Sequence, residues 1–223
     1  MEKTFKNIEK IDTFENESVY VQKCFTAMRM IAANPNIVRN IEYINSPVLE
    51  RNYILSMVYN MGKSDYLGED TKLAFGADLY FVNGENNKYI STTNLDIKNS
   101  CEYFRIPIRE NRGIEIIPDL DIHNSHSPKK GKTGDGQFLI LEAKTTNRLT
   151  SYQFMRDFFK LNLYIVGLRF QNAVSLVINK PANIIDDYIG TYKKKGFYLC
   201  NEIRSKLRLF IQEKDTPEMF KLK

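Results

Sequence analysis

The sequence predicts an α/β protein built on a mixed central sheet flanked by helices, with a helical N-terminal segment. Three observations support this fold class. Apolar residues recur at helical spacing over residues 17–31, strand-like apolar runs occupy residues 114–123 and 137–146, and a long apolar helical segment at 149–170 precedes a further strand at 173–178. The order of helix, strands, helix and strand is typical of an α/β sandwich with a mixed sheet.

The composition is that of one globular domain spanning residues 1–223. Hydrophobic residues make up 43% and charged residues 26% of the chain, which are ordinary proportions for a soluble protein. The sequence contains no repeat, low-complexity linker, apolar N-terminal segment or apolar run of membrane length. We therefore expect a soluble intracellular protein without a membrane partner, in the cytoplasm of a bacterium or, for a viral protein, in its host cell.

Charge and cysteine content narrow the classes of function. The formal net charge of +5 suits a polyanionic partner such as nucleic acid. The three cysteines, Cys24, Cys101 and Cys200, have no paired spacing. This argues against a disulfide framework or a zinc ribbon and favours a reducing compartment.

The N-terminal third is expected to be mainly helical, after a loose arm or short helix at residues 1–15. Apolar spacing and turn signals predict three helices, over residues 17–31, 37–44 and 48–61. The third helix has the clearest start, because Ser46 followed by Pro47 is typical of an N-cap and a first helical position.

The stretch 63–113 is long for a lead-in to the core and predicts additional strands. Strand composition covers residues 73–82, 89–97 and 102–108, and Asn83-Gly84 is a hairpin turn signal between the first two. We expect these strands to form an extra sheet used for substrate contact or dimerisation.

The candidate chemistry lies on the runs at 114–123 and 137–146. Because side chains alternate faces along a strand, Asp119 occupies one face of the first run, and Glu142 and Lys144 share one face of the second. If the two strands pair, two carboxylates and an amine converge at one end of an apolar sheet. A plainer interpretation makes both carboxylates edge-strand charges that pair with lysines on a solvated face.

Such a cluster suits a divalent-metal site. Carboxylate oxygens bind hard cations such as Mg²⁺, and a bound metal lowers the pKa of its water and offsets charge developing on a phosphoryl oxygen. A neighbouring lysine can orient or deprotonate the attacking water, or stabilise the phosphorane. We expect Mg²⁺ as the cofactor, with Mn²⁺ as a substitute.

Pro118-Asp119, followed on the next strand by Glu142-Ala143-Lys144, resembles the signature of the PD-(D/E)XK nuclease superfamily, which includes many restriction endonucleases, resolvases and viral nucleases. The resemblance covers roughly residues 40–180. It implies a restriction-endonuclease-like core there, followed by a helical C-terminal extension over residues 181–223. It also implies that Asp119 and Glu142 hold the metal, with the Ala143 backbone carbonyl as an extra ligand, and that Lys144 acts on the attacking water.

The resemblance implies two further site residues on helices. Members of the superfamily often place a third acidic residue on a helix before the sheet. Glu50 lies in the first turn of the helix at 48–61, in a segment similar to the acidic helix of Tn7-type transposon-end endonucleases, although the helix dipole alone also favours a glutamate there. Gln153 matches the Gln that many RecB-like members carry on the following helix, but Asp157 stands where those members have Tyr.

Basic residues outside the two strands are candidates for contact with nucleic acid. Lys129, Lys130 and Lys132 lie in the loop between the strands and can reach a phosphate backbone, unless that loop is only a solvated surface loop. Two C-terminal helices, predicted over residues 181–195 and 198–211, carry further basic groups, for which a solvated helix face is the plainer account.

The sequence therefore predicts a Mg²⁺-dependent endonuclease that hydrolyses phosphodiester bonds in DNA, of restriction or transposon-end type. A double-strand break needs two active sites, so we expect a homodimer or a larger complex on double-stranded DNA. Two alternatives stay open. One is a viral cap-snatching-like RNA endonuclease, although those enzymes usually place a His before the Pro-Asp and none precedes Asp119 here. The other is a catalytically silent nucleic-acid-binding or assembly protein with the same fold.

Overall fold

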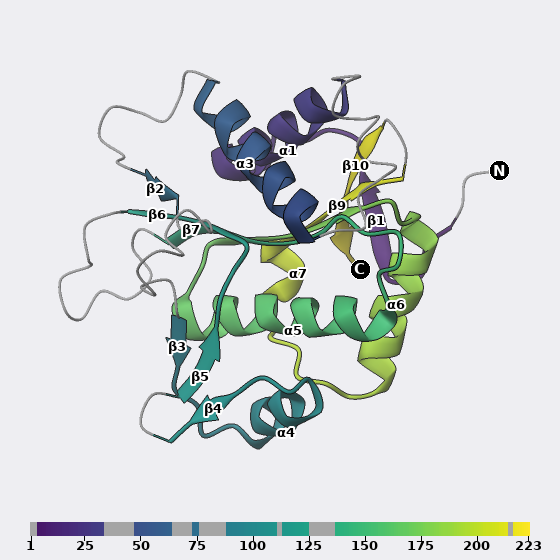
Figure 1. Ribbon diagram of the computed structural model, residues 1–223. Coiled ribbons are helices and arrows are strands. Elements are labelled where there is room, and N and C mark those ends of the chain that lie inside the picture. The colour runs from purple at the N-terminus through teal and green to yellow at the C-terminus, as the bar shows by residue number, and fades with distance from the viewer. Residues whose placement is uncertain are drawn as a thin grey trace.

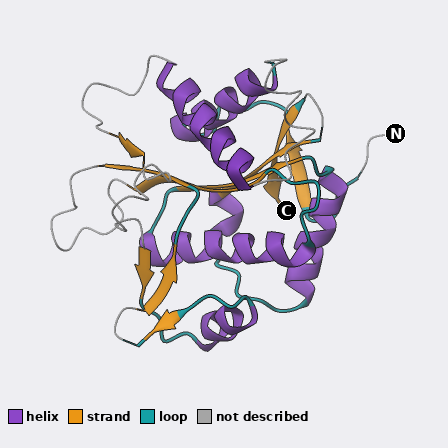
Figure 2. Cartoon of the chain, viewed as in Figure 1, coloured by secondary structure: helices purple, strands orange, loops and turns teal. Residues whose placement is uncertain are grey.

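The computed structural model describes residues 4–33, 47–63, 73–75, 88–110, 113–124, 137–213 and 216–223. Figure 1 shows the order of its elements along the chain, and Figure 2 their secondary structure. Several sequence predictions lie outside the described residues, namely the helix at 37–44, the turn at Asn83-Gly84 and the loop residues Lys129, Lys130 and Lys132.

A seven-stranded mixed sheet forms the centre of the molecule. In spatial order its strands are β1 (Ile8–Ile11), β10 (Pro217–Leu222), β9 (Leu207–Gln212), β8 (Asn172–Ile178), β7 (Gln137–Lys144), β6 (Leu120–Asn124) and β2 (Leu73–Phe75). The neighbours β7, β8 and β9 run parallel, and the other neighbouring pairs are antiparallel. The predicted mixed central sheet is thus confirmed.

Helices cover both faces of this sheet. One face carries α1 (Val19–Ala32) and α3 (Pro47–Lys63), and the other carries α5 (Ser151–Leu168), α6 (Ala182–Lys194) and α7 (Ile203–Lys206) (Figure 1). Strand β7 follows the alternation expected of a strand, because Leu139 and Leu141 pack in the core under α1 and α3, whereas Ile140 packs in the core with α5. The structure confirms the α/β class and the elements predicted here, namely α1, α3, β7, α5, β8 and α6.

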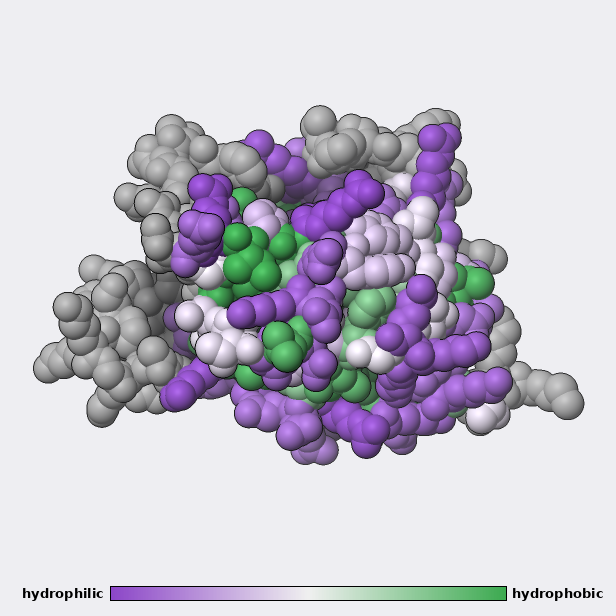
Figure 3. All heavy atoms as spheres, turned by 90° about the horizontal axis from the view of Figure 1, so that it is seen from below, coloured by the Kyte–Doolittle hydropathy of each residue, from purple (hydrophilic) through white to green (hydrophobic). Residues whose placement is uncertain are grey.

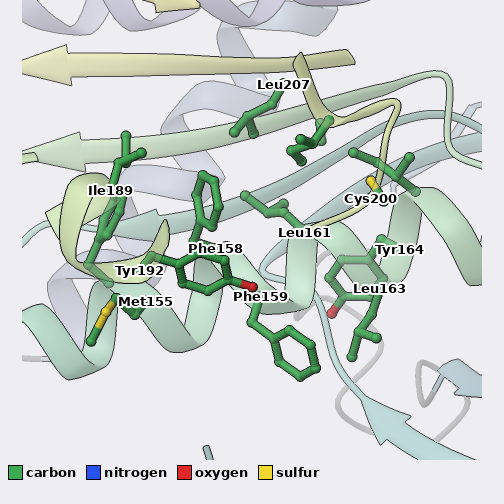
Figure 4. Close-up of a cluster of buried hydrophobic side chains, with 14 of the residues drawn as sticks. Met155, Phe158, Phe159, Leu161, Leu163, Tyr164, Ile189, Tyr192, Cys200 and Leu207 are labelled. Carbon is green, nitrogen blue, oxygen red and sulfur yellow. The ribbon is translucent and has the colours of Figure 1, made fainter. Parts of the chain in front are cut away.

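Helix α5 is held in place by its caps and by burial on several sides. A capping box between Thr150 and Gln153 begins the helix, and Arg169 ends it in the left-handed conformation with φ of 59°. Figure 4 shows its apolar side chains gathered with Tyr192 of α6 and Leu207 of β9. This packing fixes the rotation of α5, and with it the direction of the charged residues that point to the sheet.

A second, three-stranded sheet lies across α5 from the central sheet (Figure 1). Its antiparallel strands are, in order, β3 (Lys88–Ile90), β5 (Gly113–Ile116) and β4 (Ile108–Arg109), and α4 (Leu95–Tyr103) lies between β3 and β4 in the chain. The extra sheet expected from residues 63–113 therefore exists, but β2 is not part of it, because β2 pairs with β6 in the central sheet.

The strands predicted over residues 89–97 and 102–108 are largely wrong. The chain forms α4 between them, because the Asn94 side chain accepts hydrogen bonds from two backbone N–H groups of the first turn and caps a helix there. Only residues 89–90 and Ile108 of the two predicted strands are in strand conformation.

The run predicted as one strand over residues 114–123 is two strands in two different sheets. Strand β5 ends at Ile116 in the small sheet, and β6 begins at Leu120 in the central sheet. Pro118 lies between them and has no N–H group to donate to a strand ladder. As a result, Asp119 lies immediately before β6.

The prediction for the residues after α6 is wrong. Residues 198–211, predicted as a helix, contain α7 and then β9, and β10 follows as an interior strand of the central sheet. The strand β9 is buried on both faces, so its apolar residues show no period of two. Residues 181–223 therefore add two strands as well as helices to the α/β core and are not a helical extension. Residues 1–15 contribute β1 where a loose arm or short helix was expected.

Gly113 fixes the close approach of β5 to β3. Its φ is +87°, and a Cβ atom there would lie 2.4 Å from the Ile90 carbonyl oxygen. We expect Gly113→Ala to lower the free energy of unfolding by about 1–3 kcal/mol more than Gly196→Ala, because the Ile90 backbone must also move. Gly196, with φ of +69° and open space around it, carries only the left-handed strain of about 1–2 kcal/mol. Urea denaturation measures both, and equal losses would contradict the close approach.

Candidate active site

The pairing of β6 with β7 brings two carboxylates together at one end of the central sheet. Leu120 lies opposite Leu141 in the antiparallel register. Asp119, the residue before Leu120, therefore lies beside Glu142, the residue after Leu141. Asp119 Oδ2 also accepts a 2.7 Å hydrogen bond from the Ala143 N–H group, which fixes its carboxylate beside β7.

Lys144, the last residue of β7, joins three elements through its ammonium group. Its Nζ donates a 2.7 Å hydrogen bond to the Ala143 carbonyl and lies 3.2 Å from Asp157 Oδ2 of α5 and 3.4 Å from Glu50 Oε1 of α3. Glu50 thus reaches the site from the helices on the other face of the sheet. The Lys144 side chain is 23% exposed, so solvent reaches this end of the strand.

Glu142 points into the core and is paired there by α5. Lys160 Nζ lies 2.6 Å from the Glu142 carboxylate, and the Tyr164 hydroxyl donates to Glu142 Oε1 over 3.2 Å. The Glu142 side chain is only 1% exposed. Lys160 also lies 3.8 Å from Asp157 Oδ1, so this aspartate stands between the two lysines.

Six ionisable side chains make up what we name the charge cluster: Glu50, Asp119, Glu142, Lys144, Asp157 and Lys160. Four carboxylates face two ammonium groups, so the fully ionised cluster carries a formal charge of −2. This uncompensated negative charge lies at one end of the central sheet, between α3 on one face and α5 on the other.

Burial and neighbouring carboxylates raise the pKa values of Glu142 and Glu50. Burial is the main cause that raises the pKa of Glu142 well above its usual value, the charge of Lys160 opposes it, and Asp119 and Asp157 reinforce it. Burial likewise raises the pKa of Glu50, which Lys144 lowers in part and Asp119 raises further. The two glutamates therefore respond to Asp119 and behave as parts of one site.

The lysines respond in the opposite sense. Burial alone would lower the pKa of Lys144, but the surrounding carboxylates, led by Asp157 and Asp119, outweigh it and raise the pKa above its usual value. The pKa of Lys160 is raised for the same reason, with Glu142 as the leading charge. Both lysines are therefore fixed cations at neutral pH.

The two remaining sequence-predicted positions have local partners. Gln153 is exposed, and its side chain accepts hydrogen bonds from the Thr150 N–H group and hydroxyl in the capping box of α5, so it is not among the contacts of the charge cluster. The Ala143 carbonyl accepts from Lys144. Asp157, one helical turn after Gln153, reaches the site from α5, as Lys160 does.

Sequence reasoning missed Lys160 and Tyr164, both of which contact Glu142. One signal was available. Asp157, Lys160 and Tyr164 recur at helical spacing on a segment that is otherwise apolar, and polar residues on such a helix face toward the core need partners.

The carboxylates of the charge cluster have the donor chemistry of a hard divalent cation. Asp119, Glu142 and Glu50 offer carboxylate oxygens, and a divalent cation would balance the formal charge of −2. Among the described residues, no three His, Cys, Asp or Glu side chains are already grouped as a metal-ligand set. Both Lys144 and Lys160 supply positive charge to these acids in this structure.

Comparison with known proteins identified no protein similar to this chain. No protein-family model, curated protein or solved structure matches the chain. None of the helices that the structure describes has the length and apolar character needed to cross a membrane.

The Tyr164 hydroxyl gives a direct test of the Glu142 environment. We expect Tyr164→Phe to lower the free energy of unfolding by about 1–3 kcal/mol, because a buried carboxylate loses one of its donors. Tyr103→Phe is the matched control, since the Tyr103 side chain is 43% exposed and surface changes stay within about 0.5 kcal/mol. Urea denaturation of both variants makes the comparison, and equal stability of Tyr164→Phe and wild type would show that Glu142 does not need this hydrogen bond.

Proposed function

We propose that this protein is a metal-dependent nuclease that hydrolyses phosphodiester bonds in DNA, with a restriction-endonuclease-like core of the PD-(D/E)XK kind. The observation that supports it most is the arrangement at the sheet end. Asp119 lies beside Glu142 and accepts from the Ala143 N–H group, Lys144 follows Glu142 on the same strand face, and the charge cluster to which they belong carries a formal charge of −2. A divalent cation and a phosphate substrate complement that arrangement.

Asp119 and Glu142 would hold Mg²⁺ or Mn²⁺, with the Ala143 carbonyl as a further ligand. The bound metal would lower the pKa of a water molecule and offset charge on the phosphoryl oxygens. Glu50 adds a third carboxylate from α3 and holds Lys144 at 3.4 Å. Because Lys160 neutralises Glu142 at 2.6 Å, it must release this carboxylate before a cation can reach it.

Lys144 acts in this proposal as a positioned cation. Its pKa is raised by the surrounding carboxylates, so at neutral pH it keeps its proton and does not serve as a general base. Its ammonium, which is tied to Glu50, Asp157 and the Ala143 carbonyl, can instead orient the attacking water and stabilise charge on the pentacovalent phosphorane.

A restriction or transposon-end nuclease cuts both strands of a duplex. One charge cluster per chain supplies one cut, so a double-strand break needs a homodimer or a larger complex. The formal net charge of +5 suits such a polyanionic partner.

A second candidate function is a catalytically silent protein that keeps the fold for nucleic-acid binding or assembly. One observation favours it. The Glu142 side chain is only 1% exposed and already has two protein partners, Lys160 and Tyr164, which is also what a structural buried ion pair looks like.

Metal binding separates the two candidates. In isothermal titration calorimetry we expect the wild-type protein to bind Mn²⁺ and Asp119→Ala to weaken this binding by more than about 100-fold. Changing a residue that only supports a metal ligand costs up to about 100-fold in metal affinity, so the loss of a ligand itself should cost more. Asp187→Ala is the matched control, because Asp187 is an exposed carboxylate on α6 outside the charge cluster. Cleavage of supercoiled plasmid and single-stranded RNA, with metal or with EDTA, then identifies the polymer. Folded wild-type protein that binds no metal and cuts neither would leave the silent function.

A further inference from the structure

A small cavity opens beside the charge cluster, between α5 and the small sheet. It has a volume of about 250 Å³ and is lined by Ile106, Pro107, Ile116, Ile117, Arg156 and Lys160, together with Glu115. Lys160 connects the two places, because its side chain lines the cavity and its Nζ lies 2.6 Å from Glu142. A molecule in the cavity would therefore lie one side chain away from the candidate metal ligand.

The walls of the cavity combine an apolar surface with one unbalanced cation. Ile106 and Ile116 are almost fully buried and form its floor, whereas Ile117 is 42% exposed and forms its rim. Two of its charges are neutralised within the protein, since Glu115 pairs with Arg109 and Lys160 with Glu142. Within the described part of the chain, Arg156 has no hydrogen bond or ion pair of its own, so its guanidinium is available to a ligand.

An exposed aromatic pair continues from the cavity along α5. Tyr152, Arg156 and Lys160 follow each other at four-residue spacing and so form one stripe on the helix. Tyr152 is 38% exposed, its ring lies 6.0 Å from that of Tyr103, and Tyr103 is 43% exposed. Figure 3 views the molecule from the side of α4 and the small sheet, where hydrophobic patches are interleaved with polar surface. Aromatic faces beside an arginine are what unpaired bases stack on.

We propose that this cavity binds one unpaired nucleotide of the substrate, adjacent to the phosphate that the charge cluster would cleave. The apolar wall at Ile116 and Ile117 holds the base, Arg156 holds a backbone phosphate, and the next base stacks on Tyr152. The cavity is smaller than the 300–1,000 Å³ typical of pockets for drug-sized ligands, so it suits a single base. The role of its occupant as substrate rests on the function proposed above.

The geometry favours an unpaired nucleotide over an intact duplex. In a duplex the faces of each base are covered by stacking on its neighbours, and an enzyme reaches such a face only by extruding the base into a pocket. An apolar cavity with an arginine at its side offers those faces a surface and offers the phosphate a partner. The site therefore selects single-stranded or frayed segments over an intact duplex.

Fluorescence anisotropy in EDTA, where no metal-dependent cleavage occurs, tests this with the full chain and a labelled short oligothymidylate. We expect Arg156→Ala to weaken binding about tenfold, the loss of one charged hydrogen-bonded contact, and to reduce the slope of log K against log salt by about 0.7, the value for one phosphate contact of a single strand. Arg29→Ala is the matched control, because Arg29 is an exposed arginine on α1, on the other face of the central sheet.

A base-specific readout tests the apolar wall. Ile117→Ser, which removes the apolar contact without adding a charge, should weaken binding of the oligothymidylate about tenfold, but should have a much smaller effect on an oligonucleotide whose sugars lack bases. The inference is overturned if Arg156→Ala and Arg29→Ala bind alike, if a blunt-ended hairpin duplex binds with the same dependence on Arg156, or if wild-type protein does not bind the oligothymidylate.

Because this assay contains no metal, Asp119→Ala should keep the dependence on Arg156. Retained binding without any metal-dependent cleavage would refute only the proposed nuclease function.

Discussion

Lys144→Ala is expected to lower the rate of metal-dependent phosphodiester cleavage by about 100- to 10,000-fold, the range for loss of a positioned group that acts on the transferred proton or the developing charge. The physical reason is the position of the ammonium, which lies within 3.4 Å of Glu50, Asp157 and the Ala143 carbonyl at the open end of β7. No other lysine among the described residues holds these three partners together.

The measurement is the rate of supercoiled plasmid cleavage with Mg²⁺ and with Mn²⁺. Lys194→Ala serves as the control, because Lys194 is an exposed lysine in the last turn of α6. Lys144→Ala should stay folded, since Glu50 is 25% exposed and can be hydrated, and the buried Asp157 keeps Lys160 as an ion-pair partner at 3.8 Å. A variant that is folded and cuts at the wild-type rate would remove Lys144 from the mechanism and leave Lys160 as the candidate cation.

Lys160→Met is expected to lower the free energy of unfolding by about 3–5 kcal/mol at pH 8, because it leaves the Glu142 carboxylate buried without its counter-ion. The loss should be smaller at pH 5. Burial already raises the pKa of Glu142 well above its usual value, so the folded chain binds a proton at pH values where the unfolded chain does not. The stability linked to this group is therefore greatest at acid pH and falls as the pH rises toward the folded pKa.

Urea denaturation at both pH values measures this loss, and a double variant makes the test specific. Glu142→Gln combined with Lys160→Met removes both charges, and replacing both partners of a buried pair by uncharged groups is often close to neutral. The double variant should therefore be more stable than Lys160→Met alone. A Lys160→Met loss that is the same at pH 5 and pH 8 would show that Glu142 is not the group left uncompensated.

Local sequence patterns were sufficient to predict elements whose own residues determine their secondary structure. Strand β7 and helix α5 were predictable because the Leu-Ile-Leu run and the Thr150 cap determine them locally. Prediction failed where pairing with distant strands determines the secondary structure of a segment. Leu207–Gln212 is apolar and basic in a way that also fits a helix, and only its place between β8 and β10 makes it a strand. Asn94 was the available local signal for α4.

The candidate site was predictable to the extent that it lies along β6 and β7. Strand alternation and the Pro118-Asp119 and Glu142-Ala143-Lys144 motifs placed three of its residues. Lys160 was not predictable, because its role depends on how α5 is rotated against the sheet, and core packing of both faces of that helix determines the rotation. Glu50 lies between these cases, since its first-turn position is local but its contact with Lys144 is not.

The central sheet is completed by strands from opposite ends of the described chain. Strand β10 lies between β1 and β9, and Ile8 stands opposite Leu222. During synthesis on the ribosome, β1 therefore emerges long before β10, its partner in the described sheet, and its edge stays unpaired until residues 217–222 follow. Such an edge is a template for pairing with other nascent chains. The edge of β1 consequently stays open while most of the described chain is made, and the docking of β10 closes it.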